Sequence, residues 1–192
     1  NILFVGRIDK NKGIVDISKA IIYLVSKNVD VIFNIVGYEN IEDNVIESVF
    51  NLFTKNKIAH LIKFHGHVPF GDSLFKYYRD ADIFVNASMS TEGFPRTLWE
   101  SFSQCLPVVT TNVGGIGYTI ENEKNALFCN TRSYKSIALN IQKLIDNQNL
   151  RRSIIKNSFQ LAMDNSFETN IDNTFSIINS YYKKKIRIGF PD

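Results

Sequence analysis

Two carboxylates that stand eight positions apart, Glu92 and Glu100, flank a residue that is typical of a helix start. Pro95 is disfavoured inside a helix but fits its first turn, because its ring fixes φ and its missing N–H would have no partner there. We therefore expect Glu92 in the preceding loop and Glu100 roughly 7 Å further along the helix axis. The unpaired N–H groups and the positive end of the helix dipole would lie between the two acids. This arrangement suits a ligand with a diphosphate in its middle and hydroxyls at both ends, as in a sugar nucleotide.

A second group of charged side chains follows the first apolar run of the chain. Arg7 and Lys12 stand five positions apart after Gly6, in a loop that leads into a helical pattern. Arginine offers a bidentate fork of donors and lysine a compact positive charge, so together they suit a pyrophosphate. A solvated basic loop is the plainer interpretation. Because the segment from Glu92 to Glu100 also suits a phosphate ligand, we favour phosphate binding.

These segments together resemble the family 4 retaining glycosyltransferases, which have the GT-B fold. Glu92 and Glu100, with seven residues between them, resemble the E-x7-E motif of that family. Gly6-Arg7 with Lys12-Gly13 resembles its other donor-site motif, G-R-x4-K-G. The resemblance runs from about residue 2 to at least residue 144. It covers the C-terminal, donor-binding domain of such an enzyme and no other part.

The resemblance implies roles for individual residues. Glu92 would contact the transferred sugar and Glu100 the nucleotide ribose, because carboxylates accept hydrogen bonds from vicinal hydroxyls. Glu92, Arg7 and Lys12 are the expected catalytic residues, the two cations neutralising the departing diphosphate without a metal. The expected substrate-binding residues lie in three loops and at the helix start: Gly6, Gly93, Phe94, Arg96, Thr97, Leu98, Glu100, Gly114 and Gly115.

Backbone amides form part of this expected site. Those of Arg96, Thr97 and Leu98 would face the phosphates, while the Arg96 side chain could lie on the phosphates or point into water. Gly114-Gly115 could also offer amides to the ligand, although any tight turn needs such glycines. The family commonly has Pro-Glu after this glycine pair, whereas Ile116-Gly117 stands here.

Cys105 is a second departure from the family pattern, which usually has glycine where this helix ends. Glycine tolerates the left-handed conformation of a helix C-terminus, and cysteine tolerates it less well. We expect either mild strain or a different turn at Cys105. With Cys129 as the only other cysteine, the chain does not suggest a disulfide framework, and reduced, buried thiols are the expectation.

The composition is that of an ordinary soluble domain, with 44% hydrophobic and 21% charged residues in 192. We expect one nucleotide-sugar-binding domain over residues 1–192, located in the cytoplasm, either free or at the inner face of the membrane. No apolar run reaches eighteen residues. The net charge of +3 comes partly from the tail 183–187, which is either a solvated end or a weak contact with an anionic membrane surface. The basic residues are scattered among acids, which disfavours nucleic-acid binding.

Short apolar runs alternate with amphipathic segments along the chain. Strands are expected at 2–6, 31–37, 62–66, 83–87, 108–111 and 126–129. Helices are expected at 13–27, 42–55 and 72–79, after Pro95, and from 133 to about 182 with breaks near Asn147 and Asn165. This pattern predicts an α/β fold, a Rossmann-like doubly wound parallel sheet of about six strands with helices on both faces and a helical C-terminal segment.

Metal sites are not expected. Asp80-Ala81-Asp82 has the D-x-D spacing that chelates a metal in the other large glycosyltransferase fold, but it precedes a buried run, so Asp82 should open a strand. His65 and His67 have no third ligand within sequence reach, although His67 could border the nucleotide pocket.

The expected function is to bind a UDP- or GDP-linked hexose for glycosyl transfer with retention, in polysaccharide or glycan biosynthesis. The resemblance implies that an N-terminal acceptor domain is missing, that a glycan or lipid-linked acceptor binds in the whole enzyme, and that this chain alone is inactive. The alternatives are a non-catalytic nucleotide-sugar-binding module and a GT-B-like epimerase. An epimerase needs proton-transfer residues near the sugar, and only Glu92 is evident. A dehydrogenase domain would need G-x-G-x-x-G after the first strand, which residues 6–11 lack.

Overall fold

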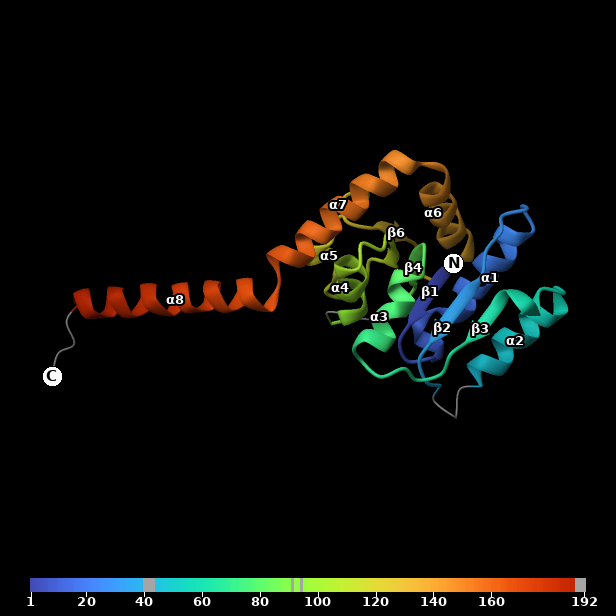
Figure 1. Cartoon of the computed structure of the whole chain (residues 1–192), viewed down its shortest axis with the longest axis horizontal. Coiled ribbons are helices and arrows are strands. Elements are labelled where there is room, and N and C mark those ends of the chain that lie inside the picture. The colour runs from blue at the N-terminus through green and yellow to red at the C-terminus, as the bar shows by residue number, and fades with distance from the viewer. Residues whose placement is uncertain (40–43, 91, 94, 189–192) are drawn as a thin grey trace.

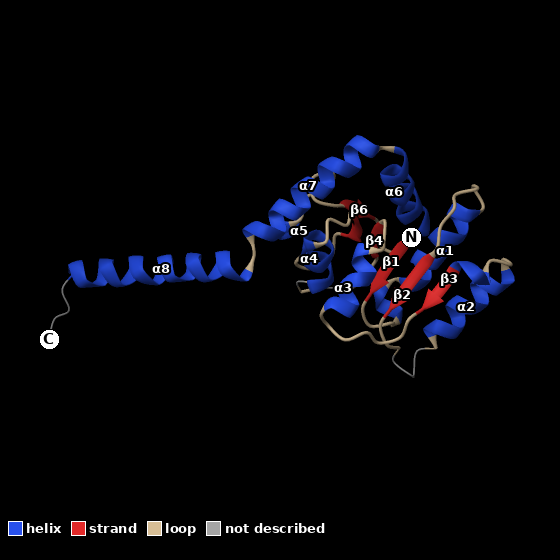
Figure 2. Cartoon of the chain, viewed as in Figure 1, coloured by secondary structure: helices blue, strands red, loops and turns tan. Residues whose placement is uncertain are grey.

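Six parallel strands form one sheet at the centre of the molecule, in the order β3-β2-β1-β4-β5-β6 (Figures 1 and 2). The computed structural model describes residues 1–39, 44–90, 92–93 and 95–188, with side chains up to residue 183. In the described chain the strands are β1 (Ile2–Val5), β2 (Phe33–Val36), β3 (Ile62–Phe64), β4 (Ile83–Asn86), β5 (Val108–Thr111) and β6 (Leu127–Cys129). The expected α/β fold is therefore confirmed.

Burial on both faces explains why these runs form a parallel sheet. Every residue of β4 and β5 is buried, as is typical of strands that are covered by helices on both sides. Side chains alternate between two hydrophobic clusters: Phe4 and Val85 belong to one, whereas Leu3 and Phe84 belong to the other.

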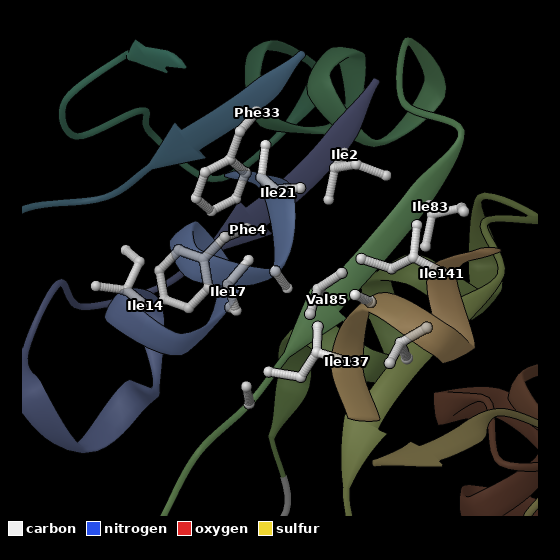
Figure 3. Close-up of a cluster of buried hydrophobic side chains, with 14 of the residues drawn as sticks. Ile2, Phe4, Ile14, Ile17, Ile21, Phe33, Ile83, Val85, Ile137 and Ile141 are labelled. Carbon is white, nitrogen blue, oxygen red and sulfur yellow. The ribbon is translucent and has the colours of Figure 1, made fainter. Parts of the chain in front are cut away.

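Helices α1 (Ile14–Val25), α2 (Val45–Lys55) and α6 (Tyr134–Asp146) supply side chains to the first cluster. Figure 3 shows how Ile14, Ile17 and Ile21 of α1 and Ile137 and Ile141 of α6 meet the side chains of the strands. The isoleucines of each helix recur at three- and four-residue spacing, which places them on one helical face.

The opposite cluster lies beneath α3 (Asp72–Arg79), α4 (Arg96–Ser103) and the short α5 (Ile116–Thr119). The helix α7 (Gln148–Asp164) packs against α4. Two short 3-10 turns, η1 (Lys10–Lys12) and η2 (Ala59–Leu61), complete the elements of the described body. Helices thus cover both faces of the sheet, and loops are left at its two ends.

The last helix, α8 (Phe167–Ile188), projects away from this body (Figure 1). Its described part exposes large apolar side chains along its length: Phe167, Ile171, Phe175, Ile177, Ile178, Tyr181 and Tyr182. In the part of the chain that the structure describes, no helix is both long and apolar enough to cross a bilayer.

The element boundaries differ from the sequence predictions by a few residues. The helix expected at 42–55 begins at Val45 in the structure, and Glu42 lies outside the described residues. Pro95 precedes the first helical residue, Arg96, rather than occupying it. The expected breaks near Asn147 and Asn165 are confirmed, since each residue separates two helices.

Cys105 follows α4 with a φ of 55°, in the left-handed region. Of the two outcomes expected there, strain or a different turn, the structure has the strained one. A non-glycine residue in this conformation costs roughly 1–2 kcal/mol relative to a right-handed one.

Candidate functional site

A crevice opens where the order of the strands reverses. Strands β2 and β3 lie on one side of β1, and β4 lies on its other side. The loops that follow β1 and β4 therefore diverge. A pocket of about 320 Å³ lies between these loops. Its described lining comprises Phe4, Val5, Gly6, Arg7, Lys12, Tyr38, Asn86, Glu92, Pro95, Arg96 and Thr97.

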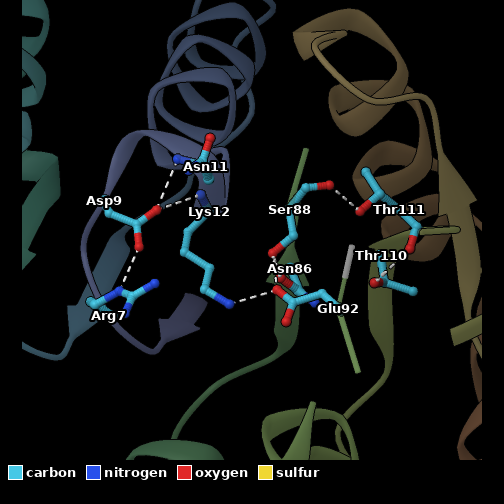
Figure 4. Close-up of polar contacts among 9 residues, drawn as sticks. All are labelled: Arg7, Asp9, Asn11, Lys12, Asn86, Ser88, Glu92, Thr110 and Thr111. Carbon is cyan, nitrogen blue, oxygen red and sulfur yellow. Dashed lines mark hydrogen bonds and ion pairs between the residues drawn. The ribbon is translucent and has the colours of Figure 1, made fainter. Parts of the chain in front are cut away.

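The basic loop after β1 is organised by Asp9, which is only 5% exposed. One carboxylate oxygen accepts hydrogen bonds from the amides of Asn11, at 2.8 Å, and Lys12, at 3.1 Å. The other accepts from Arg7 Nε at 2.6 Å. The hydrogen bond to Asp9 and the charge of Asp9 raise the pKa of the Arg7 guanidinium. Asp9 therefore caps the turn and holds the Arg7 side chain against its own loop (Figure 4).

Lys12 crosses the crevice to the acid that follows β4. Its Nζ lies 2.6 Å from Glu92 Oε1, and the two side chains are 26% and 14% exposed. Gly13 makes this approach possible: it has a φ of +70°, and a Cβ there would come within 2.0 Å of the Ala87 carbonyl oxygen. The first loop can therefore sit directly against the end of β4.

Glu92 is held from behind by the glycine pair. The Gly115 amide donates to the Glu92 carbonyl oxygen at 2.8 Å. Gly114 has a φ of +60°, and a Cβ there would stand 1.9 Å from that same oxygen. Neither glycine is among the residues that line the pocket. We predicted amides offered to a ligand at this pair, but the Gly115 amide already holds Glu92; the exposed Gly93 lies beside it, outside the pocket lining.

The start of α4 places two of the three expected amides at the pocket. Arg96 and Thr97 line it, and the amides of both donate to no described residue. The third, that of Leu98, donates to the Pro95 carbonyl at 3.1 Å, and the Leu98 side chain is buried. The prediction of an available amide at Leu98 was wrong, because the first turn of α4 closes on itself. Phe94 lies outside the described residues.

Glu100 lies deeper along α4 and has a partner of its own. Its Oε2 accepts a hydrogen bond from the hydroxyl of Tyr78 at 2.6 Å. Tyr78 is fully buried, and burial together with this hydrogen bond raises its pKa far above the ordinary value, so the hydroxyl stays a donor. Glu100 does not line the pocket. The structure thus brings Glu92 into one pocket with Arg7 and Lys12, whereas Glu100 lies outside the lining of that pocket.

Four residues at this site were missed by the sequence analysis: Asp9, Tyr38, Asn86 and Ser88. A signal existed for Asp9, because an aspartate directly before a helical turn is a common N-cap that accepts from the amides two and three positions later. Asn86 also gave one, as a polar residue at the end of an otherwise apolar strand. Tyr38 carried no pattern that set it apart from a surface tyrosine.

The described residues contain no group of three or more histidine, cysteine, aspartate or glutamate side chains that could hold a metal ion. His65 contacts Asn34 at 3.0 Å, and burial lowers its pKa. Tyr38 and His67 lie near each other at the rim, with ring centroids 6.3 Å apart. The charged groups that line the pocket are cations with a single carboxylate.

Several known proteins are similar to this chain. The capsular polysaccharide biosynthesis glycosyltransferase CapM of Staphylococcus aureus is 32% identical over 154 residues, which cover 80% of this chain and 39% of CapM. The crystal structure of the C-terminal domain of LpcC, a glycosyl transferase group 1 family protein from Francisella tularensis, superposes with a TM-score of 0.77 at 25% identity, covering 85% of this chain and 84% of that domain. Anabaena HepE in complex with UDP-glucose has a TM-score of 0.80 at 18% identity, over 94% of this chain and 48% of HepE, and shares the fold.

The chain spans about two-fifths of the length of the curated relatives it matches, 39% in the case of CapM. The family model described as "Glycosyl transferases group 1" matches residues 1–161, which include all six strands and every residue that lines the pocket. The chain therefore belongs to the glycosyl transferases group 1 family.

Proposed function

We propose that this part of the protein binds a nucleotide-sugar donor, a UDP- or GDP-linked hexose, and that the whole protein transfers the hexose with retention at the anomeric carbon. One observation carries the proposal: Arg7, Lys12, Glu92 and the start of α4 converge on one pocket from three separate segments. Its volume of about 320 Å³ lies within the range of small-ligand sites, roughly 300–1,000 Å³. The UDP-glucose complex of HepE, which has the same fold, supports this choice of ligand.

The diphosphate is the part of the donor that this pocket suits best. Lys12 and Arg7 supply positive charge, and the amides of Arg96 and Thr97 stand at the positive end of the α4 dipole. Negative charge grows on the diphosphate as its bond to the sugar breaks. Donors that are already in place stabilise this charge without having to reorganise, which lowers the barrier. We propose that these groups act without a metal ion.

Glu92 is suited to orient the hexose. Lys12 occupies its Oε1, and its other oxygen accepts from no described residue. A carboxylate oxygen accepts hydrogen bonds from sugar hydroxyls. Glu92 thus orients the anomeric carbon over the departing phosphate, and Glu100 would contact the nucleotide ribose.

The acceptor requires the rest of the protein. CapM is more than twice as long as the segment it shares with this chain. On α8, Phe167, Ile171, Phe175, Ile178 and Tyr182 recur at three- and four-residue spacing and are all exposed, which is the pattern of a helix face that packs against another element. We propose that an N-terminal acceptor domain covers this face and binds a glycan or lipid-linked acceptor in the cytoplasm or at the inner face of the membrane. This chain alone would bind donor and transfer nothing.

Calorimetric titrations of the chain with UDP, GDP and NAD test the proposal. Binding of UDP or GDP without binding of NAD is the expected result, and binding of NAD alone would contradict it. With the whole protein, release of nucleoside diphosphate that depends on an added acceptor indicates transfer. Conversion of one sugar nucleotide into another would instead identify an epimerase, and donor binding without either reaction would identify a binding module.

A further inference from the structure

Behind Glu92 lies a chain of three buried polar residues that comes from two neighbouring strands. Thr111, at the end of β5, donates its hydroxyl to the Ser88 carbonyl at 2.7 Å. The Ser88 hydroxyl donates to Glu92 Oε1, and it also lies 3.0 Å from Asn86 Oδ1. Asn86, Ser88 and Thr111 are 4%, 1% and 0% exposed. Figure 4 shows Thr111 bonded to the Ser88 main chain, and the Ser88 side chain beside Asn86 and Glu92, opposite Lys12.

A count of protons fixes the direction of this row. A serine hydroxyl carries one proton, and an ionised carboxylate can only accept, so the Ser88 proton goes to Glu92. Asn86 Nδ2 is buried and has no partner among the described residues. A half-turn of the Asn86 amide exchanges its nitrogen and oxygen. Nδ2 then donates to Ser88 Oγ, and the buried amide gains the partner it lacks.

Polar groups at these positions need an explanation, because buried polar side chains cost free energy that an apolar side chain at the end of a strand would not. One explanation is that they fix the position of the loop after β4, but the Gly115 amide already bonds to the Glu92 carbonyl. The row instead ends on the side chain of Glu92. With Ser88 and Lys12 both bound to Oε1, rotation of the carboxylate would break both hydrogen bonds, and Oε2 is left without a partner among the described residues.

We propose that Asn86, Ser88 and Thr111 are positioning residues, which form a buried hydrogen-bond chain that orients the Glu92 carboxylate toward the hexose of the donor. This inference rests on the proposed function. It predicts that the row contributes to recognition of the sugar and not to recognition of the nucleotide. Ser88 and Thr111 do not line the pocket and would not touch the ligand, whereas Asn86 lines it and acts through Ser88.

The test compares Ser88→Ala with wild type in calorimetric titrations of the 192-residue chain against UDP, UDP-glucose, GDP and GDP-mannose. The nucleotide and nucleotide-sugar pair that binds wild type is then used throughout. Loss of a hydrogen bond to a charged group should lower affinity for the sugar nucleotide about tenfold. Affinity for the nucleotide alone should stay unchanged.

Two further variants make this result specific. Ser158→Ala removes another fully buried serine hydroxyl, one that donates to the Ile155 carbonyl in α7 far from the pocket, and should change neither affinity. Thr111→Val keeps the side-chain volume, and so guards against failure of Ser88→Ala to fold. It should reproduce the selective loss on a smaller scale, with its thermal unfolding transition serving as the check of folding.

A double-mutant cycle with Glu92→Gln decides whether Ser88 acts through Glu92. In the Glu92→Gln background, Ser88→Ala should cost less than half of its effect in wild type. Equal losses for nucleotide and nucleotide sugar, or fully additive losses, would overturn the inference while leaving the proposed function intact. Failure of wild type to bind any of the four ligands would overturn the proposed function, and the inference with it.

Discussion

The two ends of the parallel sheet carry pockets of opposite character. The pocket at the amino ends of the strands is the larger, at about 680 Å³, against about 320 Å³ at the carboxyl ends. Its two described arginines have their partners outside the pocket: Arg79 pairs with Asp72 at 3.4 Å, and Arg151 donates to the Leu144 carbonyl at 3.2 Å. At the carboxyl ends, cations, amides and one carboxylate face the same space. Convergence of charge, rather than volume, therefore identifies the candidate site.

The direction of the strands explains the difference. Because all six strands are parallel, each helix that follows a strand begins at the carboxyl end of the sheet. Unpaired N–H groups and positive dipole ends gather there, whereas helix carbonyls gather at the other end. An anionic ligand is favoured at the first end before any side chain is considered. Arg7 and Lys12 add to a field that the fold already provides.

Replacing Lys12 should give the largest difference in nucleotide affinity between a variant at the carboxyl end and its control at the amino end. Lys12→Met keeps the aliphatic stem, removes the charge and leaves Glu92 unpaired beside the incoming phosphates. Affinity for UDP or GDP, measured by calorimetry, should fall about ten- to a hundredfold, because charge-assisted hydrogen bonds contribute about 1.5–3 kcal/mol. Arg79→Met removes a cation from the amino-end pocket and should leave affinity unchanged. Equal losses in the two variants would remove the distinction between the ends.

A methyl group at Gly114 should displace the backbone of the loop that carries Glu92 at the carboxyl end of the sheet. Gly114→Ala would place a Cβ 1.9 Å from the Glu92 carbonyl oxygen, so the loop must shift. Gly66→Ala is the matched control, since Gly66 has a similar φ of +66° and nothing within 4 Å of an added Cβ. Both variants should lose roughly 1–2 kcal/mol of stability to the left-handed conformation. Only Gly114→Ala should lose more than this and also weaken sugar-nucleotide binding. Identical behaviour of the two would mean that the glycine pair does not support Glu92.

Tyr78 tests how far the site extends along α4. Tyr78→Phe removes the donor to Glu100 and should cost about 1 kcal/mol of stability and a few-fold in nucleotide affinity. Tyr77→Phe, one position earlier, should cost neither. Because the pKa of Tyr78 is raised in the folded state, its contribution to stability is present below pH 10 and is lost as pH rises above it. Chemical denaturation between pH 8 and pH 11 should therefore show a shallower decline for Tyr78→Phe than for wild type, and parallel declines would refute this role.

Labelling of the exposed thiol should have the smallest effect on nucleotide affinity. Cys105 is exposed and lines the amino-end pocket, whereas Cys129 is buried, and burial raises its pKa to about 12. A maleimide at pH 7.5 should modify Cys105 alone, because Cys129 is neither accessible nor ionised. The label fills part of the larger pocket and should leave UDP affinity unchanged. A loss of affinity on labelling would assign the ligand to the amino end.

The sequence was informative wherever a local pattern decides the structure. The strand at 108–111 and the helix at 72–79 were predicted with the bounds that they have, since apolar runs and amphipathic periods are local. The resemblance also implied one donor site for Arg7, Lys12 and Glu92, and all three line one pocket in the structure.

Contacts across elements could not be read from the sequence. The bond from Tyr78 to Glu100 joins α3 to α4 and depends on how these helices pack. The hydrogen bond from Thr111 to Ser88 depends on the pairing of β4 with β5. The Leu98 amide was also predicted to be available. It bonds instead to the Pro95 carbonyl within the first turn of α4, and the residue types do not reveal this local geometry.

Mapping the amide chemical shifts that change when UDP or GDP is titrated into ¹⁵N-labelled chain tests the location of the site most directly. We expect the largest changes at residues around the pocket at the carboxyl ends of the strands: Gly6, Arg7, Lys12, Arg96 and Thr97. Changes centred instead on Asn28, Asp30, Gln104 and Cys105, around the larger pocket at the amino ends, would contradict this location.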